Sequence, residues 1–297
     1  AQKLSDTSID FTTDTKYGDY ELDVNGLPET VNTVYGVVIS TKEGDNYGLR
    51  HLENIWKKKE LAWSTGFVTT SHGNTLDSKN YEKMMGQTIN KITYYTDNGI
   101  YEIDADQYVP VKFNGTIAAE NADVESGKVN VTVEGLPGDY QAEYTVEGLE
   151  DVQVKDGVLT YKTKGAEIGK YTLKVSDKSG KYADLTTDFE LTTEAVPVVF
   201  NSESAALVAA EGYAAEDVTS YVKNIESVTV DGTEYAATGK RAVKIIKEDG
   251  TIDTTAAPFK SAENGQEFKI TVKATGYAKD YEFTYTLSQE SEYTYAY

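Results

Sequence analysis

The chain has 297 residues, with 49 acidic and 28 basic side chains, no cysteine, and a net charge of −21 at pH 7. This balance excludes nucleic acid as the main partner, because phosphate binding needs a positive surface, and no apolar run reaches the roughly 18 residues that a membrane span needs. With two His and no Cys, the sequence predicts neither a metal site nor a cofactor.

Residues 1–116 combine strand and helix patterns, which predicts an α+β domain. Apolar residues at helical spacing predict a helix over residues 49–63, and a shorter helix is expected over residues 78–85. The Asn98-Gly99 pair predicts a hairpin that joins residues 94–96 to residues 100–103, because both residues tolerate positive φ.

This N-terminal domain also holds the candidate ligand-binding residues, which are Arg50, His51, Trp56 and Trp63. A Trp face beside Arg and His suits stacking on a sugar or recognition of a cation. The structural alternative is that both Trp side chains are core anchors packed on the strands of residues 94–108. His51 and Glu53 would lie on different faces of a helix, so no acid–base pair, no catalytic residue and no enzymatic activity are predicted.

Residues 117–196 show alternating strand patterns and no helix. The Asp156-Gly157 pair predicts a second hairpin. Four aromatic residues are expected in the core: Tyr140, Tyr144, Tyr171 and Phe189. The segment is therefore predicted to form an immunoglobulin-like or fibronectin-like β-sandwich, and a spacer role is expected for it.

Residues 197–290 contain two strand patterns, SVTVD from residue 227 and FKITVKA from residue 268, and a helix is expected over residues 214–224. In these strands Val228 and Val230 should face the core together, and Gly276 should adopt positive φ. Asp217 near the start of the helix would suit a capping role. The sequence thus predicts a β-rich domain with one short helix, followed by a tail over residues 291–297.

The paired motifs SVTVDGTEY (227–235) and ITVKATGY (270–277) resemble the hemoglobin-interacting domain of Gram-positive surface hemoprotein receptors, over about residues 213–288. The resemblance implies a β-rich framework and offers hemoglobin or another heme protein as a partner. Tyr213, Tyr235 and Tyr277 are the candidate protein-interaction residues. Direct heme ligation is not expected here, because this part lacks His, Met and Cys.

Taken together, the sequence predicts a mainly β multidomain protein that is extracellular and associated with the wall or surface of a Gram-positive bacterium. The start at Ala1 and the polar, Tyr-rich end indicate a mature or excised piece of an exported protein, and the absence of Cys fits that location. The predicted role is non-catalytic binding, adhesion or spacing, with a host or cell-surface protein or a glycan as partner. Two alternatives remain open: a fragment of a hemoglobin or heme-protein receptor, and a glycan- or cell-wall-binding module.

Overall fold

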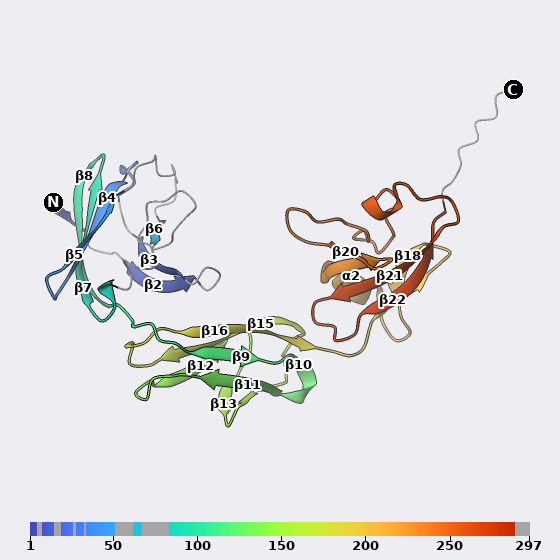
Figure 1. The fold of residues 1–297 in the computed structure, drawn as a ribbon, viewed down its shortest axis with the longest axis horizontal. Coiled ribbons are helices and arrows are strands. Elements are labelled where there is room, and N and C mark those ends of the chain that lie inside the picture. Colours follow the sequence, from blue (N-terminus) through green and yellow to red (C-terminus); the bar gives the residue numbers. More distant parts are fainter. Residues whose placement is uncertain are drawn as a thin grey trace. The chain divides into compact units, whose positions relative to one another are not determined.

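Strands dominate the described part of the chain, as expected of a mainly β multidomain protein. The computed structural model describes residues 1–4, 8–14, 19–25, 28–32, 34–50, 62–66 and 83–288 (Figure 1). The chain divides into two compact units. Unit 1 comprises Ala1–Ile117, Thr132–Thr145 and Lys174–Thr187, and unit 2 comprises Ala118–Val131, Val146–Leu173 and Asp188–Tyr297. The domain boundaries predicted at residues 116, 196 and 290 stay predictions.

A five-stranded sheet forms the N-terminal part of unit 1. Its order is β1 (Gln2–Lys3), β8 (Gly99–Tyr108), β7 (Thr88–Thr96), β4 (Val34–Thr41) and β5 (Asn46–Arg50), antiparallel except between β1 and β8. The predicted hairpin joins β7 to β8, but Asp97 and Asn98 form its turn, and Gly99 with φ 111 already pairs with Thr96. The buried side chains of this part include Ile39, Met84, Ile89, Ile92, Tyr94 and Ile103.

A second, three-stranded antiparallel sheet has the order β2 (Ser8–Asp14), β3 (Asp19–Asn25) and β6 (Ala62–Gly66). The helix predicted over residues 49–63 is wrong at both ends. Arg50 pairs with Gly36 in the β4–β5 ladder, and Trp63 pairs with Val24 in the β3–β6 ladder. Cross-strand pairing therefore outweighs the helical spacing of the apolar residues. Of the helix predicted over residues 78–85, Lys83 and Met84 are helical, whereas residues 78–82 lie outside the described residues.

Two four-stranded sheets build the sandwich predicted for the middle of the chain. One has the order β10 (Ala122–Asp123), β16 (Leu185–Thr192), β15 (Gly169–Asp177) and β12 (Ala142–Val146). The other has the order β13 (Gln153–Lys155), β14 (Val158–Thr160), β11 (Lys128–Glu134) and β9 (Thr116–Ala119), and the 3-10 turn η1 (Val124–Ser126) follows β10. The hairpin at Asp156-Gly157 is confirmed, with φ 51 and 76. Phe189 is buried, and Tyr140, Tyr144 and Tyr171 are half-buried.

The C-terminal part of unit 2 combines a hairpin, a helix and a sheet. Strand β17 (Val198–Asn201) pairs with β18 (Ala206–Ala209), and α2 (Ala215–Lys223) packs against both. The antiparallel sheet has the order β20 (Thr233–Ala236), β19 (Ile225–Val230), β21 (Glu267–Ala274) and β22 (Tyr281–Thr286), with the 3-10 turn η2 (Ala257–Phe259) before β21. The predicted helix is confirmed, and the Asp217 carboxylate accepts a hydrogen bond from the backbone N–H of Ala214 at 2.8 Å.

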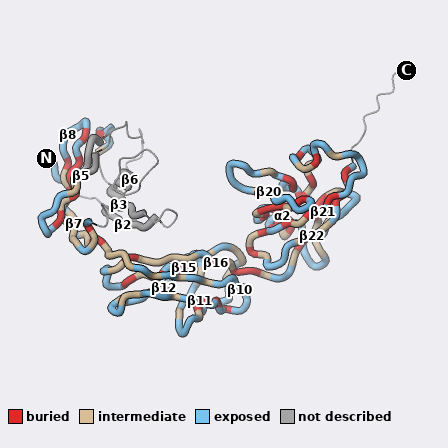
Figure 2. The backbone as a smooth tube through the Cα atoms, in the orientation of Figure 1, coloured by how far each residue is buried: buried red, intermediate tan, exposed pale blue. Residues whose placement is uncertain are grey.

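Buried residues alternate with more exposed ones along β21, so one face of this C-terminal sheet carries the core. Figure 2 marks the buried residues of this part in red. Val228 pairs with Val272 and Val230 pairs with Ile270, so the predicted inward face is confirmed. The helix adds three buried side chains to this core: Val218, Tyr221 and Val222. Phe259 is 0% exposed, and its ring centroid lies 4.9 Å from that of Phe268 and 5.4 Å from that of Tyr285.

Candidate binding site

The turn that follows β21 carries the second sequence motif and shapes the candidate site. Gly276 has φ 85, as predicted, in the left-handed region that favours glycine. The next residue, Tyr277, is half-buried, and its ring packs edge-on against that of Tyr221 with 4.8 Å between centroids. The turn thus holds one motif tyrosine against helix α2.

The same turn is joined to the sandwich strands of unit 2 by its backbone. The carbonyl of Gly276 accepts a hydrogen bond from the N–H of Thr193 at 3.0 Å, and the N–H of Ala278 donates to the carbonyl of Thr193 at 3.0 Å. A Cβ at position 276 would lie 3.2 Å from the side chain of Ile168. Glycine is therefore required here both for the positive φ and for the close approach of Ile168. The turn thus connects the C-terminal part of unit 2 to its sandwich strands, and we call this set of contacts the joint.

Glu226 adds a charged contact to this joint. Its carboxylate accepts a hydrogen bond from Thr275 Oγ1 at 2.5 Å and lies 2.8 Å from Lys170 Nζ and 3.8 Å from Lys273 Nζ. The hydrogen bond from Lys170, followed by that from Thr275, lowers the pKa of Glu226. With 28% of its side chain exposed, Glu226 is screened less than a fully solvated surface charge.

A cleft of about 380 Å³ opens beside the joint, within unit 2. Four carboxylates line it, those of Asp123, Glu190, Glu194 and Asp280, together with Lys273 and the ring of Tyr277. The volume lies at the lower end of the range of about 300–1,000 Å³ found for ligand pockets. Its charge favours a cationic group over an anionic one.

Two large apolar side chains are exposed in the same unit. Val199 on β17 is 42% exposed and pairs across the hairpin with Val208, and Tyr213 before α2 is 40% exposed. Tyr213 also lies near Tyr277, whose pKa is raised by burial first, then by Asp217, and then by Tyr213. The structure therefore brings two of the three predicted interaction tyrosines into one region. Exposed aromatic residues of this kind are typical of protein-binding surfaces.

The other predicted site residues are placed differently. Tyr235 lies on edge strand β20 opposite Val228 and packs against the core. Arg50 belongs to β5 and Trp63 to β6, strands of two different sheets. His51 and Trp56 lie outside the described residues. A ligand site made by these four N-terminal residues therefore stays a prediction.

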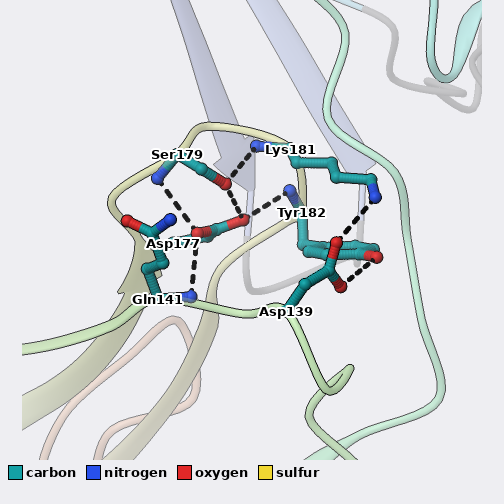
Figure 3. A network of polar contacts seen from close by, with 6 residues as sticks. All are labelled: Asp139, Gln141, Asp177, Ser179, Lys181 and Tyr182. Atoms are coloured by element: carbon teal, nitrogen blue, oxygen red, sulfur yellow. Dashed lines mark hydrogen bonds and ion pairs between the residues drawn. The ribbon is translucent and has the colours of Figure 1, made fainter.

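A polar network that the sequence analysis missed closes the turn between β15 and β16 in unit 1 (Figure 3). The Asp177 carboxylate accepts hydrogen bonds from the backbone N–H groups of Gln141 (3.1 Å), Ser179 (3.0 Å) and Tyr182 (3.1 Å), and from the Ser179 hydroxyl (2.8 Å). Burial alone would raise the pKa of Asp177, but these hydrogen bonds outweigh it and lower the pKa.

Asp139 extends this network toward solvent. It accepts hydrogen bonds from Lys181 Nζ at 2.7 Å and from Tyr182 Oη at 2.6 Å. The contacts hold the loop, so the network is structural although its residue types could serve catalysis. The Asp-x-Ser-Gly pattern at residues 177–180 was the available sequence signal, because an Asp side chain often bonds the backbone two residues on.

Within the described residues, no three or more His, Asp and Glu side chains gather closely enough to hold a metal ion. The carboxylates of the cleft are thus spread around its lining. No helix in the described part of the chain is both long and apolar enough to cross a membrane.

Comparison with known proteins identifies one part of the chain. Residues 201–287 match the family described as "Heme-binding protein Shr-like, Hb-interacting domain", which confirms the resemblance found in the sequence motifs. A search of curated proteins gave no match.

Solved structures similar to the chain include repeats and modules of large surface proteins. The tetra-tandem repeat of a large adhesion protein is 14% identical (98% of this chain, 74% of that chain, TM-score 0.22). Domains 4–9 of a surface-layer protein are 12% identical (96% and 50%, TM-score 0.21). A structure concerned with host cell surface retention of a bacterial ice-binding adhesin is 14% identical (97% and 99%, TM-score 0.19). These TM-scores are too low to support an argument about fold or function. The informative finding of these comparisons is therefore the similarity of residues 201–287 to the Shr-like, hemoglobin-interacting family.

Proposed function

We propose that the chain is part of a non-catalytic, extracellular binding protein of a Gram-positive bacterial surface. Its C-terminal part binds a heme-carrying protein, and hemoglobin is the first partner to test. The observation that carries this proposal is the match of residues 201–287 to a hemoglobin-interacting domain.

The partner is proposed to be the protein that carries heme, and free heme is the less suitable ligand. Every His and Met of the chain precedes residue 86, and there is no Cys. In the C-terminal part an axial heme ligand would therefore have to be a Tyr. Tyr221 is fully buried and Tyr277 is half-buried, with their rings in contact. These side chains serve packing, which supports contact through the outer surface.

The exposed surface around Tyr213 and Val199 is the proposed contact. Tyr side chains supply large area at low entropic cost and are frequent among the residues that dominate binding energy. Glu211 and Glu216 are exposed on either side of Tyr213 in the chain. These two carboxylates beside an exposed ring favour a partner surface with an apolar centre and basic residues at its rim.

The sandwich is proposed to support the binding domain as a fixed spacer. The backbone hydrogen bonds of Thr193 and the Glu226–Lys170 ion pair support this role. A flexible linker would lack such paired contacts.

The test is binding of hemoglobin to the full chain, measured by biolayer interferometry and by co-elution at micromolar concentration. We expect a complex, and we expect Tyr213→Ala to weaken it at least tenfold, because loss of an aromatic anchor costs about 2 kcal/mol. The matched control is Tyr95→Ala, since Tyr95 is 42% exposed but belongs to unit 1. No complex with the unchanged chain, or equal weakening by both substitutions, would contradict the proposal.

A further inference from the structure

A buried threonine hydroxyl and a glutamine carboxamide face each other at the edge of the N-terminal sheet. Thr41, the last residue of β4, is 4% exposed, and Gln87, immediately before β7, is half-buried. Thr41 Oγ1 donates a hydrogen bond to Gln87 Oε1 at 2.8 Å across 46 residues of sequence. Because a carbonyl bond is about 1.2 Å long, the hydroxyl oxygen lies within about 4 Å of the carboxamide carbon.

Both groups are fixed by further contacts. The Thr41 hydroxyl accepts a hydrogen bond from the N–H of Asp45 at 3.2 Å, which sets its orientation. The backbones are tied beside it, since the N–H of Lys42 donates to the carbonyl of Thr88 at 2.8 Å. Holding two reacting groups in place in this way replaces much of the entropic cost of bringing them together.

The nitrogen of the same carboxamide points to a separate set of acceptors. Gln87 Nε2 donates to the Asp45 carboxylate, to Tyr47 Oη and to the carbonyl of Lys83, each at 3.0 Å. The Tyr47 hydroxyl in turn lies 3.3 Å from the Asp45 carboxylate. Burial, as the largest effect, raises the pKa of Tyr47, which keeps its hydroxyl protonated near neutral pH. The oxygen thus faces a nucleophile, and the nitrogen faces groups able to pass a proton.

We propose that Thr41 and Gln87 form an intramolecular ester crosslink without an added catalyst. Thr41 Oγ1 attacks the Gln87 carboxamide carbon, and the C–N bond breaks. The hydroxyl proton moves to Gln87 Oε1, to which the hydroxyl already donates, and from there to solvent. As the C–N bond breaks, Tyr47 Oη, which the Asp45 carboxylate holds, gives a proton to the nitrogen, and solvent reprotonates Tyr47. The nitrogen leaves as ammonia. One C–O bond replaces one C–N bond, no electrons are transferred, and the chain loses about 17 Da. Asp45 is exposed, so ammonia has a path to solvent, and its dilution favours the product.

The crosslink would join the ends of two neighbouring strands. Strands β4 and β7 pair antiparallel, and the register shifts between Ser40 and Thr41. A covalent bond at this shift would hold the sheet where its ladder is irregular. This proposal concerns the N-terminal part and does not depend on the partner proposed for residues 201–287.

Intact mass spectrometry of the full chain tests the proposal. We expect a mass 17 Da below the sequence value, and after trypsin digestion we expect residues 17–42 linked to residues 84–91. Mild base should release the two peptides by ester hydrolysis and leave Glu at position 87. An intact mass at the sequence value with no linked peptide would overturn the proposal.

Substitutions separate this crosslink from other losses of ammonia. Thr41→Val and Gln87→Ala should each abolish the linked peptide, whereas Thr41→Ser should retain it. Thr96→Val is the matched control, because the hydroxyl of buried Thr96 donates to the carbonyl of Gly99 at 2.8 Å and should not react. Asp45→Asn should slow formation at least tenfold. Loss of the link in Thr96→Val, or its persistence in Thr41→Val, would refute the assignment, and unchanged formation in Asp45→Asn would refute the proton path.

Discussion

Tyr221 carries a buried hydroxyl that has no hydrogen-bond partner among the described residues, and its side chain is 0% exposed. Burial, as the largest effect, raises its pKa far above the usual range, so the group is a neutral hydroxyl at any physiological pH. A buried polar group without a partner costs about 1–3 kcal/mol. Tyr221→Phe removes this oxygen and keeps the ring, including its contact with Tyr277 at 4.8 Å. We therefore expect the free energy of unfolding of the C-terminal part to rise by about 1–3 kcal/mol.

Tyr140→Phe is the matched control, because the same atom is removed from a different setting. Tyr140 Oη lies 3.1 Å from the carbonyl oxygens of both Val175 and Ala183, to which it donates. Losing this hydrogen bond should lower the free energy of unfolding by about 0.5–1.5 kcal/mol. One chemical change is thus expected to stabilise at position 221 and to destabilise at position 140.

Differential scanning calorimetry of the full chain can measure both effects. For a part of this size, each 1 kcal/mol shifts the melting temperature by about 4–8 °C. The Tyr221→Phe variant should raise one transition, and the Tyr140→Phe variant should lower one. A lower or unchanged melting temperature in Tyr221→Phe would show that its hydroxyl is satisfied or inconsequential, and would refute the reasoning.

Three further predictions follow from contacts described above. Asp177→Asn should lower the free energy of unfolding of the sandwich at pH 7 and make that free energy depend less on pH in acid. The pKa of Asp177 is lowered on folding, so its stabilising contribution is present above the unfolded pKa of about 3.9 and is lost as the pH falls through the folded pKa. An unchanged pH profile of urea unfolding would contradict this. Gly276→Ala should lower the free energy of unfolding more than Gly232→Ala does. Both glycines have positive φ, but of the two only position 276 has a neighbour, Ile168, at 3.2 Å from an added Cβ. Equal midpoints of urea unfolding in the two variants would contradict the close-approach argument. Phe259→Ala should lower the free energy of unfolding by about 3–5 kcal/mol, since Phe259 is 0% exposed. A loss below about 1 kcal/mol in circular dichroism melts would show that the core collapses into the space left by the ring.

Local patterns predicted the parts of the fold that local forces decide. The turn pair Asp156-Gly157 formed the predicted hairpin because both residues tolerate positive φ. Helix α2 followed its apolar spacing and its Asp217 cap. The helix predicted over residues 49–63 was wrong at both ends, because pairing with β4 and β3 decides the conformation of Arg50 and Trp63.

The candidate sites depend on contacts between residues far apart in the chain. The sequence predicted positive φ for Gly276 and offered Tyr277 as an interaction residue. No spacing could show that Thr193 and Ile168 meet this turn. The approach of Thr41 to Gln87 spans 46 residues and follows from the register of β4 against β7. Such pairings are set by the tertiary fold and leave no periodic trace in the sequence.

Among the described residues, β20 and β22 occupy the two ends of the C-terminal sheet. The outer side of β20 has one backbone contact, from the N–H of Val243 to the carbonyl of Ala236 at 2.9 Å. Unpaired strand edges invite pairing with another chain. Glu234 on β20 and Glu282 on β22 are exposed and place a carboxylate on each edge, where like charges on a second copy would repel. The net charge of −21 at pH 7 adds repulsion between whole copies of the chain. This repulsion weakens as the pH approaches the isoelectric point of about 4.5, so the protein should self-associate there. The charge of the chain would thereby keep the strand edges of separate copies apart at neutral pH and let them approach in acid.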